Sequence, residues 1–234
     1  MSSPASCGRG LLRTFLAVAA FLSPAPSLHA GTIAVVPIRI ELDPAATFCA
    51  LHVSNLGKEP VAVQVRGFGW SQMADGSDRL EPAGIRLNPS VMEIPSGQKK
   101  LVRCALPPHV GASESSFRLI VDELPPGQAQ PGTVQAVLRL SIPLFRSPKG
   151  AAPALRWREG PLGWLELLNV GRAHATVGRV VVRRAGQEPD TIDRGFYLLA
   201  GSVRSLPLTA GSAITGVEVV TGPGQPQAVA KLQR

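Results

Sequence analysis

The stretch VQAVLRLSIPLF, residues 134–145, decides the fold of this chain. Apolar residues at every second position are typical of a β-strand with one apolar face. A second strand-like run, SFRLIVDELPP (residues 116–126), lies just upstream across the connection GQAQPG, so the two runs predict a long hairpin. A long exposed strand with an apolar face is normally suppressed in proteins, so we expect this one to be a donor strand lent to another protein. Its donor residues are Val134, Ala136, Leu138, Leu140 and Ile142.

The first 30 residues have the pattern of a targeting segment. Arg9 and Arg13 form a short basic region, and the apolar run 15–22 that follows is too short to span a membrane. Small residues then lead to Ala30. We expect a secretory signal peptide over residues 1–30, cleaved near Ala30, with an uncleaved anchor helix as the alternative. No later segment approaches transmembrane length, so the mature chain is not expected to be an integral membrane protein.

Positive charge exceeds negative charge in the mature chain. Removing residues 1–30 takes away Arg9 and Arg13 and no acids, which lowers the formal net charge from +8 to +6. The remaining bases are scattered, with small clusters at residues 99–103 and 183–184, and they carry no nucleic-acid signature. Nucleic acid is therefore not an expected partner. Two interpretations stay open, a solvated basic surface and a basic groove for an anionic group such as a terminal carboxylate.

Cysteine and histidine positions limit the chemistry of the chain. Cys7 lies in the signal peptide, so Cys49 and Cys104 remain, each alternating with apolar residues in a strand-like run. Export to an oxidising compartment favours a Cys49–Cys104 disulfide, and two buried free thiols are the alternative. The four histidines show no metal-ligand spacing, so neither a metal site nor a cofactor is expected.

Short strands separated by Gly-, Pro-, Asp- and Asn-rich turns fill the chain after Ala30, and no segment has a sustained helical stripe. Seven strands before residue 147 are typical of an immunoglobulin-like sandwich. The Pro- and Gly-containing segment 146–153 then predicts an interdomain hinge. We expect an all-β protein with two sandwiches in series, over residues 31–147 and 148–234. The predicted strands are 33–42, 47–55, 61–70, 90–94, 98–105, 117–123, 134–145, 155–159, 164–169, 177–184, 195–199, 203–208 and 214–220.

Catalysis is not expected. The chain has no Gly-x-Ser-x-Gly elbow, and the adjacent Asp122 and Glu123 point to opposite faces of a strand. Asp190 and Asp193 are predicted to lie in a turn. We therefore expect no catalytic residues and no enzymatic activity.

Five motifs in order carry a family resemblance and together span most of residues 33–148. These motifs are Ile38-Arg39-Ile40, LHVSN at 51–55, the Pro-x-Gly turn at 95–97 followed by Leu101-Val102-Arg103, ESSFRL through ELPP at 114–126, and IPLFR at 142–146. The chain thus resembles the periplasmic pilus (fimbrial) assembly chaperones, the PapD-like family, in a divergent branch. The second domain matches only in size, β content and the strand 164–169 with its turn.

The resemblance implies a periplasmic chaperone that binds, folds and caps pilus subunits by donor-strand complementation. It also implies delivery of the subunit to an outer-membrane usher, and the uncovered apolar strand suggests a free protein that caps itself as a homo-oligomer. The alternatives are a pilin-like or adhesive surface β-sandwich protein, and an ordinary core strand at 134–145.

Two sets of site residues follow from the resemblance. The family anchors the subunit's terminal carboxylate with a basic pair, and Arg39 matches the first member. Pro143 occupies the position of the usual lysine, so Arg103 or Arg118 is expected to replace it. The family also fixes the angle between its domains with an acid and a base, which here match Glu114 and Arg146.

Overall fold

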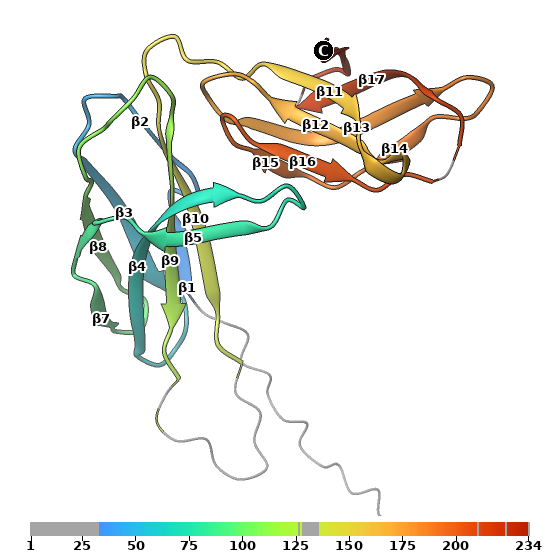
Figure 1. Cartoon of the computed structure of the whole chain (residues 1–234). Coiled ribbons are helices and arrows are strands. Elements are labelled where there is room, and N and C mark those ends of the chain that lie inside the picture. Colours follow the sequence, from blue (N-terminus) through green and yellow to red (C-terminus); the bar gives the residue numbers. More distant parts are fainter. Residues whose placement is uncertain (1–32, 126, 128–135, 210, 223, 234) are drawn as a thin grey trace, which may run out of the picture.

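β-Strands make up nearly all the regular structure of the computed structural model, which describes residues 33–125, 127, 136–209, 211–222 and 224–233. The strands form two β-sandwich domains set at an angle to each other, with a long hairpin of the first reaching toward the second (Figure 1). The predicted fold class, all-β with two immunoglobulin-like sandwiches, is confirmed. The boundary expected at residues 147–148 falls between the last strand of the first sandwich and the first strand of the second.

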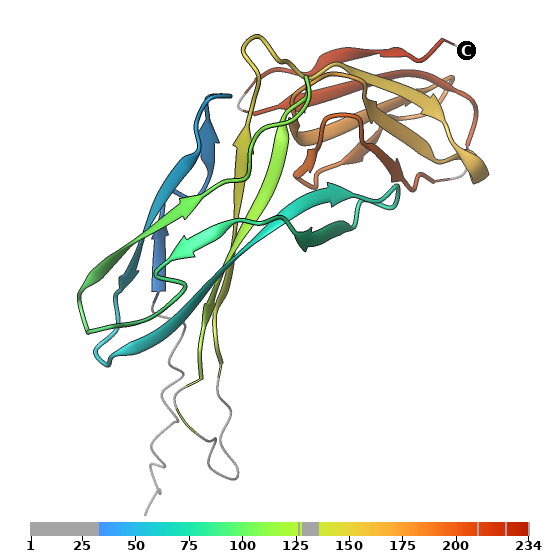
Figure 2. The ribbon, with the colours of Figure 1, turned by 60° about the vertical axis from the view of Figure 1, so that its left-hand side comes forward.

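The first sandwich packs a four-stranded sheet, ordered β1-β3-β8-β6, on a six-stranded sheet, ordered β2-β10-β9-β4-β5 with β7 on β4. Figure 2 shows the two layers and the long β4, β9 and β10 strands that continue toward the second domain. The strands are β1 (Ile33–Val36), β2 (Ile40–Leu42), β3 (Phe48–Asn55), β4 (Val61–Gln72), β5 (Asp78–Pro82), β6 (Arg86–Asn88), β7 (Val91–Ile94), β8 (Lys99–Ala105), β9 (Ser115–Glu123) and β10 (Arg139–Arg146).

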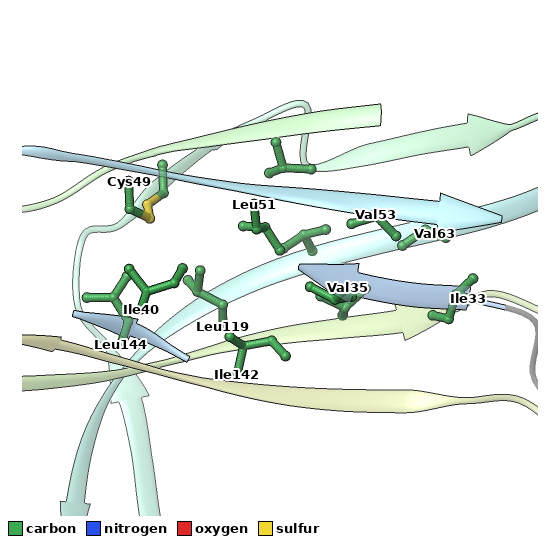
Figure 3. Packing of buried hydrophobic residues seen from close by; sticks show 14 of the residues in the cluster. Ile33, Val35, Ile40, Cys49, Leu51, Val53, Val63, Leu119, Ile142 and Leu144 are labelled. Atoms are coloured by element: carbon green, nitrogen blue, oxygen red, sulfur yellow. A yellow bond between two sulfur atoms is a disulfide. The ribbon is translucent and has the colours of Figure 1, made fainter. Parts of the chain in front are cut away.

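The first core forms where the inward faces of the two sheets meet. Leu51 and Val53 of β3 are fully buried, as are Leu119 of β9 and Leu144 of β10. Figure 3 shows these side chains between the sheets, with Ile142 of β10 among them. Burying a large aliphatic side chain stabilises a fold by roughly 1.5–3 kcal/mol, so this strand alternation supplies much of the domain's stability.

Cys49 and Cys104 lie opposite each other in the antiparallel pairing of β3 with β8. Both side chains are buried in the first core, and their Cα atoms are 5.0 Å apart. The structure joins them as a disulfide between two strands of the same sheet.

The single strand predicted over residues 33–42 is wrong, because the chain changes sheets within it. β1 pairs with β3 in the four-stranded sheet, whereas β2 pairs in parallel with the end of β10 in the six-stranded sheet. Pro37 lies between β1 and β2. Proline has no amide hydrogen to donate, so it interrupts a ladder at the place where the chain crosses over.

Residues 71–89, between two of the predicted strands, contain two strands that were not predicted, β5 and β6. β5 pairs with the far half of β4, opposite residues 68–72, and all of its side chains are exposed. A fully exposed strand has no apolar alternation and therefore no sequence signal. Asp75 forms the hairpin's turn, since its Oδ1 accepts hydrogen bonds from the Ser77 amide and hydroxyl.

The second sandwich is a continuous eight-stranded arrangement, because β18 pairs with β17 on one side and with β11 on the other. Two of its strands, β14 and β18, were not predicted; β14 includes Asp190, which was expected in a turn. Its elements are β11 (Leu155–Glu159), a 3-10 turn η1 (Pro161–Gly163), β12 (Leu165–Asn169), β13 (Ala175–Arg184), β14 (Asp190–Ile192), β15 (Phe196–Leu198), β16 (Val203–Leu206), β17 (Ile214–Thr221) and β18 (Gln227–Lys231).

Asn169, at the end of β12, fastens the linker to the second domain. Its side chain is buried, accepts hydrogen bonds from the amides of Ala154 and Gly171, and donates to the carbonyls of Ala173 and Leu198. A Cβ on Gly171 would lie 2.4 Å from the Ala152 oxygen, so only glycine fits against the linker. The segment expected to be a hinge is therefore bonded to the domain that follows it.

Reducing the Cys49–Cys104 disulfide should lower the free energy of unfolding by about 4 kcal/mol, because the two residues are 55 positions apart and the bond restricts the unfolded chain. Urea unfolding of exported protein, with and without reductant, measures the difference. The Cys49→Ala/Cys104→Ala variant should match the reduced protein. Free alkylation of both thiols in folded protein would contradict the disulfide.

Candidate functional site

An aromatic cluster joins the two domains. Trp70 of β4 and Phe145 of β10 come from the first domain, and Tyr197 of β15 and Leu199 come from the second. The Tyr197 ring centre lies 5.6 Å from that of Trp70 and 5.5 Å from that of Phe145. Phe145 is fully buried, so the contact excludes water and holds the domains together. None of these residues was predicted, since nothing local to their positions marks an interdomain contact.

The tip of the β4–β5 hairpin is bonded to the second domain beside this cluster. The Gln72 side chain donates to the Tyr197 carbonyl and accepts from the Leu199 amide, both at 2.9 Å. The Ser205 amide of β16 donates to the Ala74 carbonyl at 2.8 Å. These bonds explain why the hairpin projects from its own sandwich in Figure 1.

Glu114 connects the domains, but its partner is not the expected Arg146. The Glu114 side chain has no exposed surface, and its carboxylate lies 2.9 Å from His174 Nδ1. It also accepts hydrogen bonds from the His174 amide and from the Ser147 hydroxyl. Burial alone would raise the pKa of Glu114, but the hydrogen bonds from His174 and Ser147 outweigh it and hold the pKa below its usual value.

Arg146 points the other way because side chains alternate along β10. Ile142, Leu144 and Arg146 face the first core, whereas Phe145 faces the second domain. The buried Arg146 guanidinium donates to the carbonyls of Pro107 and Ala46, both in the first domain. The expected Glu114–Arg146 pair is therefore corrected to Glu114 with His174 and Ser147.

Arg39 lies between the two domains, just before β2, and we call the region around Arg39, Arg118 and Tyr197 the interdomain cleft. Its guanidinium donates to Thr176 Oγ1 at 3.3 Å, lies 2.9 Å from His174 Nε2, and forms an ion pair with the exposed Glu41. Its central carbon is 5.6 Å from the Phe145 ring centre, a cation–π distance. The side chain keeps about a third of its surface exposed, so it is accessible from the cleft.

Arg118 reaches the same cleft from β9. It lies directly opposite Pro143 in the β9–β10 register, so its side chain emerges next to the position that lacks a lysine. Its guanidinium carbon lies 3.6 Å from the Trp70 ring centre, and an ion pair joins it to Asp78. Burial lowers the pKa of Arg118, although the charges of Asp78 and Tyr197 counteract this. Arginine remains protonated at physiological pH despite such shifts.

Arg103 is not part of this cleft. It lies on β8 of the four-stranded sheet, between the buried Val102 and Cys104, so alternation turns it to the outer surface. Its partners across the ladders are Ala50 of β3 and Asn88 of β6, both in that sheet. The structure thus places Arg39 and Arg118 near the same Tyr197 ring and leaves Arg103 on the other sheet.

Three buried donor atoms at the cleft have no hydrogen-bond acceptor among the residues that the structure describes: Arg39 Nε, Arg118 Nε and Trp70 Nε1. Both guanidinium carbons lie 5.8 Å from the centre of the Tyr197 ring. A buried donor without an acceptor costs free energy. Partly buried cations with unused donors suit an anion, and a carboxylate matches the guanidinium fork.

β10 presents an open edge that leads to this cleft. β9 pairs along the whole strand. On the other side, the pairing found among the described residues is that of β2 with Leu144, Phe145 and Arg146. Pro143, which has no amide hydrogen, is acceptable on such an edge. Figure 1 shows β10 beginning far from the second domain and ending beside it.

The predicted donor residues divide into two groups along β10 and the segment before it. Ile142 is 4% exposed and belongs to the first core, so its expected availability to a partner is wrong. Leu138 and Leu140 are half-buried at the margin of that core, and Ala136 is exposed before the strand begins. Val134 lies outside the described residues. An ion pair of Arg139 with Asp122 fixes the start of the strand on β9.

Neither a metal-ligand cluster nor a membrane-spanning helix is found within the described ranges. No three potential metal-ligating side chains gather there. In the same part of the chain, no helix is long and apolar enough to cross a membrane.

A two-sandwich protein with an open edge strand and a basic cleft between its domains has the architecture of a pilus chaperone. The family of pili and flagellar-assembly chaperones, PapD N-terminal domain, matches residues 32–152. The chain belongs to this family, whose members are periplasmic chaperones of pilus assembly and not enzymes. No curated protein sequence gives a significant match to the chain.

Solved structures share the whole architecture. A chain of the CsuC–CsuE chaperone–tip adhesion subunit pre-assembly complex, from the archaic chaperone-usher Csu pili of Acinetobacter baumannii, is 25% identical with a TM-score of 0.70. The match covers 87% of this chain and all of that one. The Escherichia coli chaperone DraB is 20% identical with a TM-score of 0.61, over 87% and 97% of the two chains. A chain of the Salmonella enterica SafA pilin–SafB chaperone complex is 19% identical with a TM-score of 0.61, over 86% and 97%.

The interdomain contact should weaken in acid through Glu114. Its pKa is lower in the folded than in the unfolded chain, so its stabilisation is complete above the unfolded value, near 4.5, and is lost as the pH falls through the folded value. Glu114→Gln should cost about 1–3 kcal/mol at pH 7 and flatten this dependence. Urea unfolding from pH 7 to pH 3 tests both, with the exposed Glu93→Gln as control. An unchanged profile in Glu114→Gln would refute the role.

Proposed function

We propose that this chaperone captures a pilus subunit by donating the edge of β10 to it and by binding the subunit's terminal carboxylate in the interdomain cleft. The observation that carries the proposal is the open edge of β10, which runs into a cleft containing two arginines with unused donors. An added strand would gain main-chain hydrogen bonds along this edge and side-chain contacts with its apolar face. Its terminal carboxylate would then meet Arg39 and Arg118.

The donor segment extends from residue 134 to residue 140 in this proposal, so it comprises the approach to β10 and the first two residues of that strand. Leu138 and Leu140 keep part of their surface free in the unbound chain, and their face continues the line of Ile142 and Leu144. A subunit groove that covers them would bury more apolar surface than the free protein does. Strand addition in this way completes the partner's sheet and extends the chaperone's own sheet at the same time.

Arg39 and Arg118 form the carboxylate anchor in this proposal, in place of the lysine that Pro143 excludes. Arg118 lies directly across the ladder from Pro143, so a base on β9 takes the place of a base on β10. A guanidinium pairs with a carboxylate through two parallel hydrogen bonds, which adds direction to the charge attraction. Arg103 has no part in the anchor.

The remaining steps follow from family membership. The signal peptide over residues 1–30 would direct the chain to the periplasm, and the loaded chaperone would deliver its subunit to an outer-membrane usher. The open edge of β10 favours a free protein that covers the edge with a second copy of itself, because exposed strand edges associate.

Substitutions on one face of the donor segment should weaken subunit capture, and those on the other face should not. Ala136→Asp and Leu138→Asp should weaken capture of a co-expressed subunit more than a hundredfold, because a charge in an apolar groove costs several kcal/mol. Val137→Asp is the matched control, since Val137 is half exposed on the opposite face, and it should bind normally. Ile142→Asp should unfold the chaperone itself. Equal losses for Leu138→Asp and Val137→Asp would refute the assignment.

The anchor is tested with substitutions to methionine, which remove the guanidinium but keep an unbranched apolar stem. Arg39→Met and Arg118→Met should each weaken subunit binding about 10- to 150-fold, as expected for a charged hydrogen bond of about 1.5–3 kcal/mol. Arg103→Met should have no effect, since Arg103 is exposed on the other sheet. The dissociation constants can be measured by titration of purified chaperone with a subunit peptide. An effect of Arg103→Met as large as that of Arg118→Met would contradict the anchor.

A further inference from the structure

His174 connects the interdomain contact to the arginine that faces the cleft. Its ring lies directly before β13 of the second domain, with Nδ1 2.9 Å from both carboxylate oxygens of Glu114 and Nε2 2.9 Å from Arg39 Nη2. The chain Ser147, Glu114, His174, Arg39 is thus an unbroken series of hydrogen bonds from the linker to the cleft.

These partners define the protonation of the ring. The ionised Glu114 can only accept hydrogen bonds, so Nδ1 must carry a hydrogen. Arginine can only donate, so the contact with Arg39 needs a lone pair on Nε2. The ring that satisfies both partners is the neutral Nδ1–H tautomer.

The position of the His174 ring is also fixed, by its packing between the domains. It stacks on Phe145 of β10, with ring centres 3.6 Å apart and planes inclined by 11°. The His174 side chain is only 9% exposed, and its own amide donates to Glu114. A rotation of the ring would break the stacking and both polar contacts together.

We propose that His174 is a positioning residue that holds the Arg39 guanidinium ready for the subunit's carboxylate. The inference rests on the proposed function of Arg39 as an anchor. Thr176 of the same domain accepts a second hydrogen bond from Arg39, so the second domain orients a side chain of the first. Orientation before binding increases affinity, because the side chain loses less freedom when the ligand arrives. The exposed Glu41 pair holds Arg39 less firmly, since such pairs contribute little.

The tautomer is measured directly in the full mature chain. Long-range proton–nitrogen NMR spectra of the free protein at pH 7.5 distinguish a protonated from a bare ring nitrogen. We expect a hydrogen on Nδ1 and none on Nε2 of His174. A ring with its hydrogen on Nε2 would overturn the inference, because that nitrogen could not accept from Arg39.

Positioning is tested with two forms of one probe, a synthetic peptide of alternating valine and threonine that ends in a free carboxylate or in an amide. The wild-type chaperone should bind the carboxylate form at least tenfold more tightly. His174→Phe keeps an aromatic ring next to Phe145 but cannot accept from Arg39. It should lose most of this preference while binding the amide form as the wild type does.

His174→Gln should restore the preference, since its amide oxygen can accept near the position of Nε2. Near-ultraviolet circular dichroism establishes that both variants keep their packing. Equal weakening of the two peptides by His174→Phe would show a role in domain docking alone and would overturn the inference. A wild-type protein that binds both peptides equally would instead refute the carboxylate anchor itself, and with it the positioning role.

Discussion

β10 is the strand on which the rest of the structure depends, because it is buried on both faces near its end and open along one edge near its beginning. Ile142 and Leu144 fill the first core, and Phe145 on the opposite face is buried against the second domain. This double burial leaves the end of the strand no freedom to move. The edge before it is therefore presented to a partner from a rigid support, which lowers the cost of ordering on binding.

Charged side chains lie beside β10 because they share with it the outer face of the six-stranded sheet. Glu114, Arg118 and Phe145 share this face, which the second domain covers. Because the second domain covers this face, part of the water is removed from the cations there. Arg118, which stacks on Trp70, is one of them. Electrostatic attraction to an anion is stronger in such surroundings than at an open surface. The same packing thus holds the domains together and strengthens the cleft's attraction for a carboxylate.

Sequence alternation predicted the two sandwiches, most strands and the facing positions of Cys49 and Cys104, because burial repeats every second residue in a strand. It could not detect β5, whose side chains are all exposed, or the change of sheet at Pro37. The family pattern led to Arg39 and Glu114, which do lie between the domains. The pattern was wrong for Arg146, because neighbouring side chains of a strand point to opposite faces and Arg146 points into the first domain. His174, Tyr197 and Gln72 act across domains, and no local pattern indicates such contacts.

The β4–β5 hairpin crosses from the first domain to the second, and this limits how far the two domains can be exchanged between proteins. Its tip bonds to the backbone of the second domain through Gln72 and Ala74, and Trp70 below it is covered by Tyr197. Excising the first domain would leave these groups without their hydrogen-bond partners and would expose the aromatic side chains to water. The two sandwiches are consequently not exchangeable parts, and a recombinant that joins halves of different chaperones would have to bring the hairpin tip and its receiving strands from the same parent.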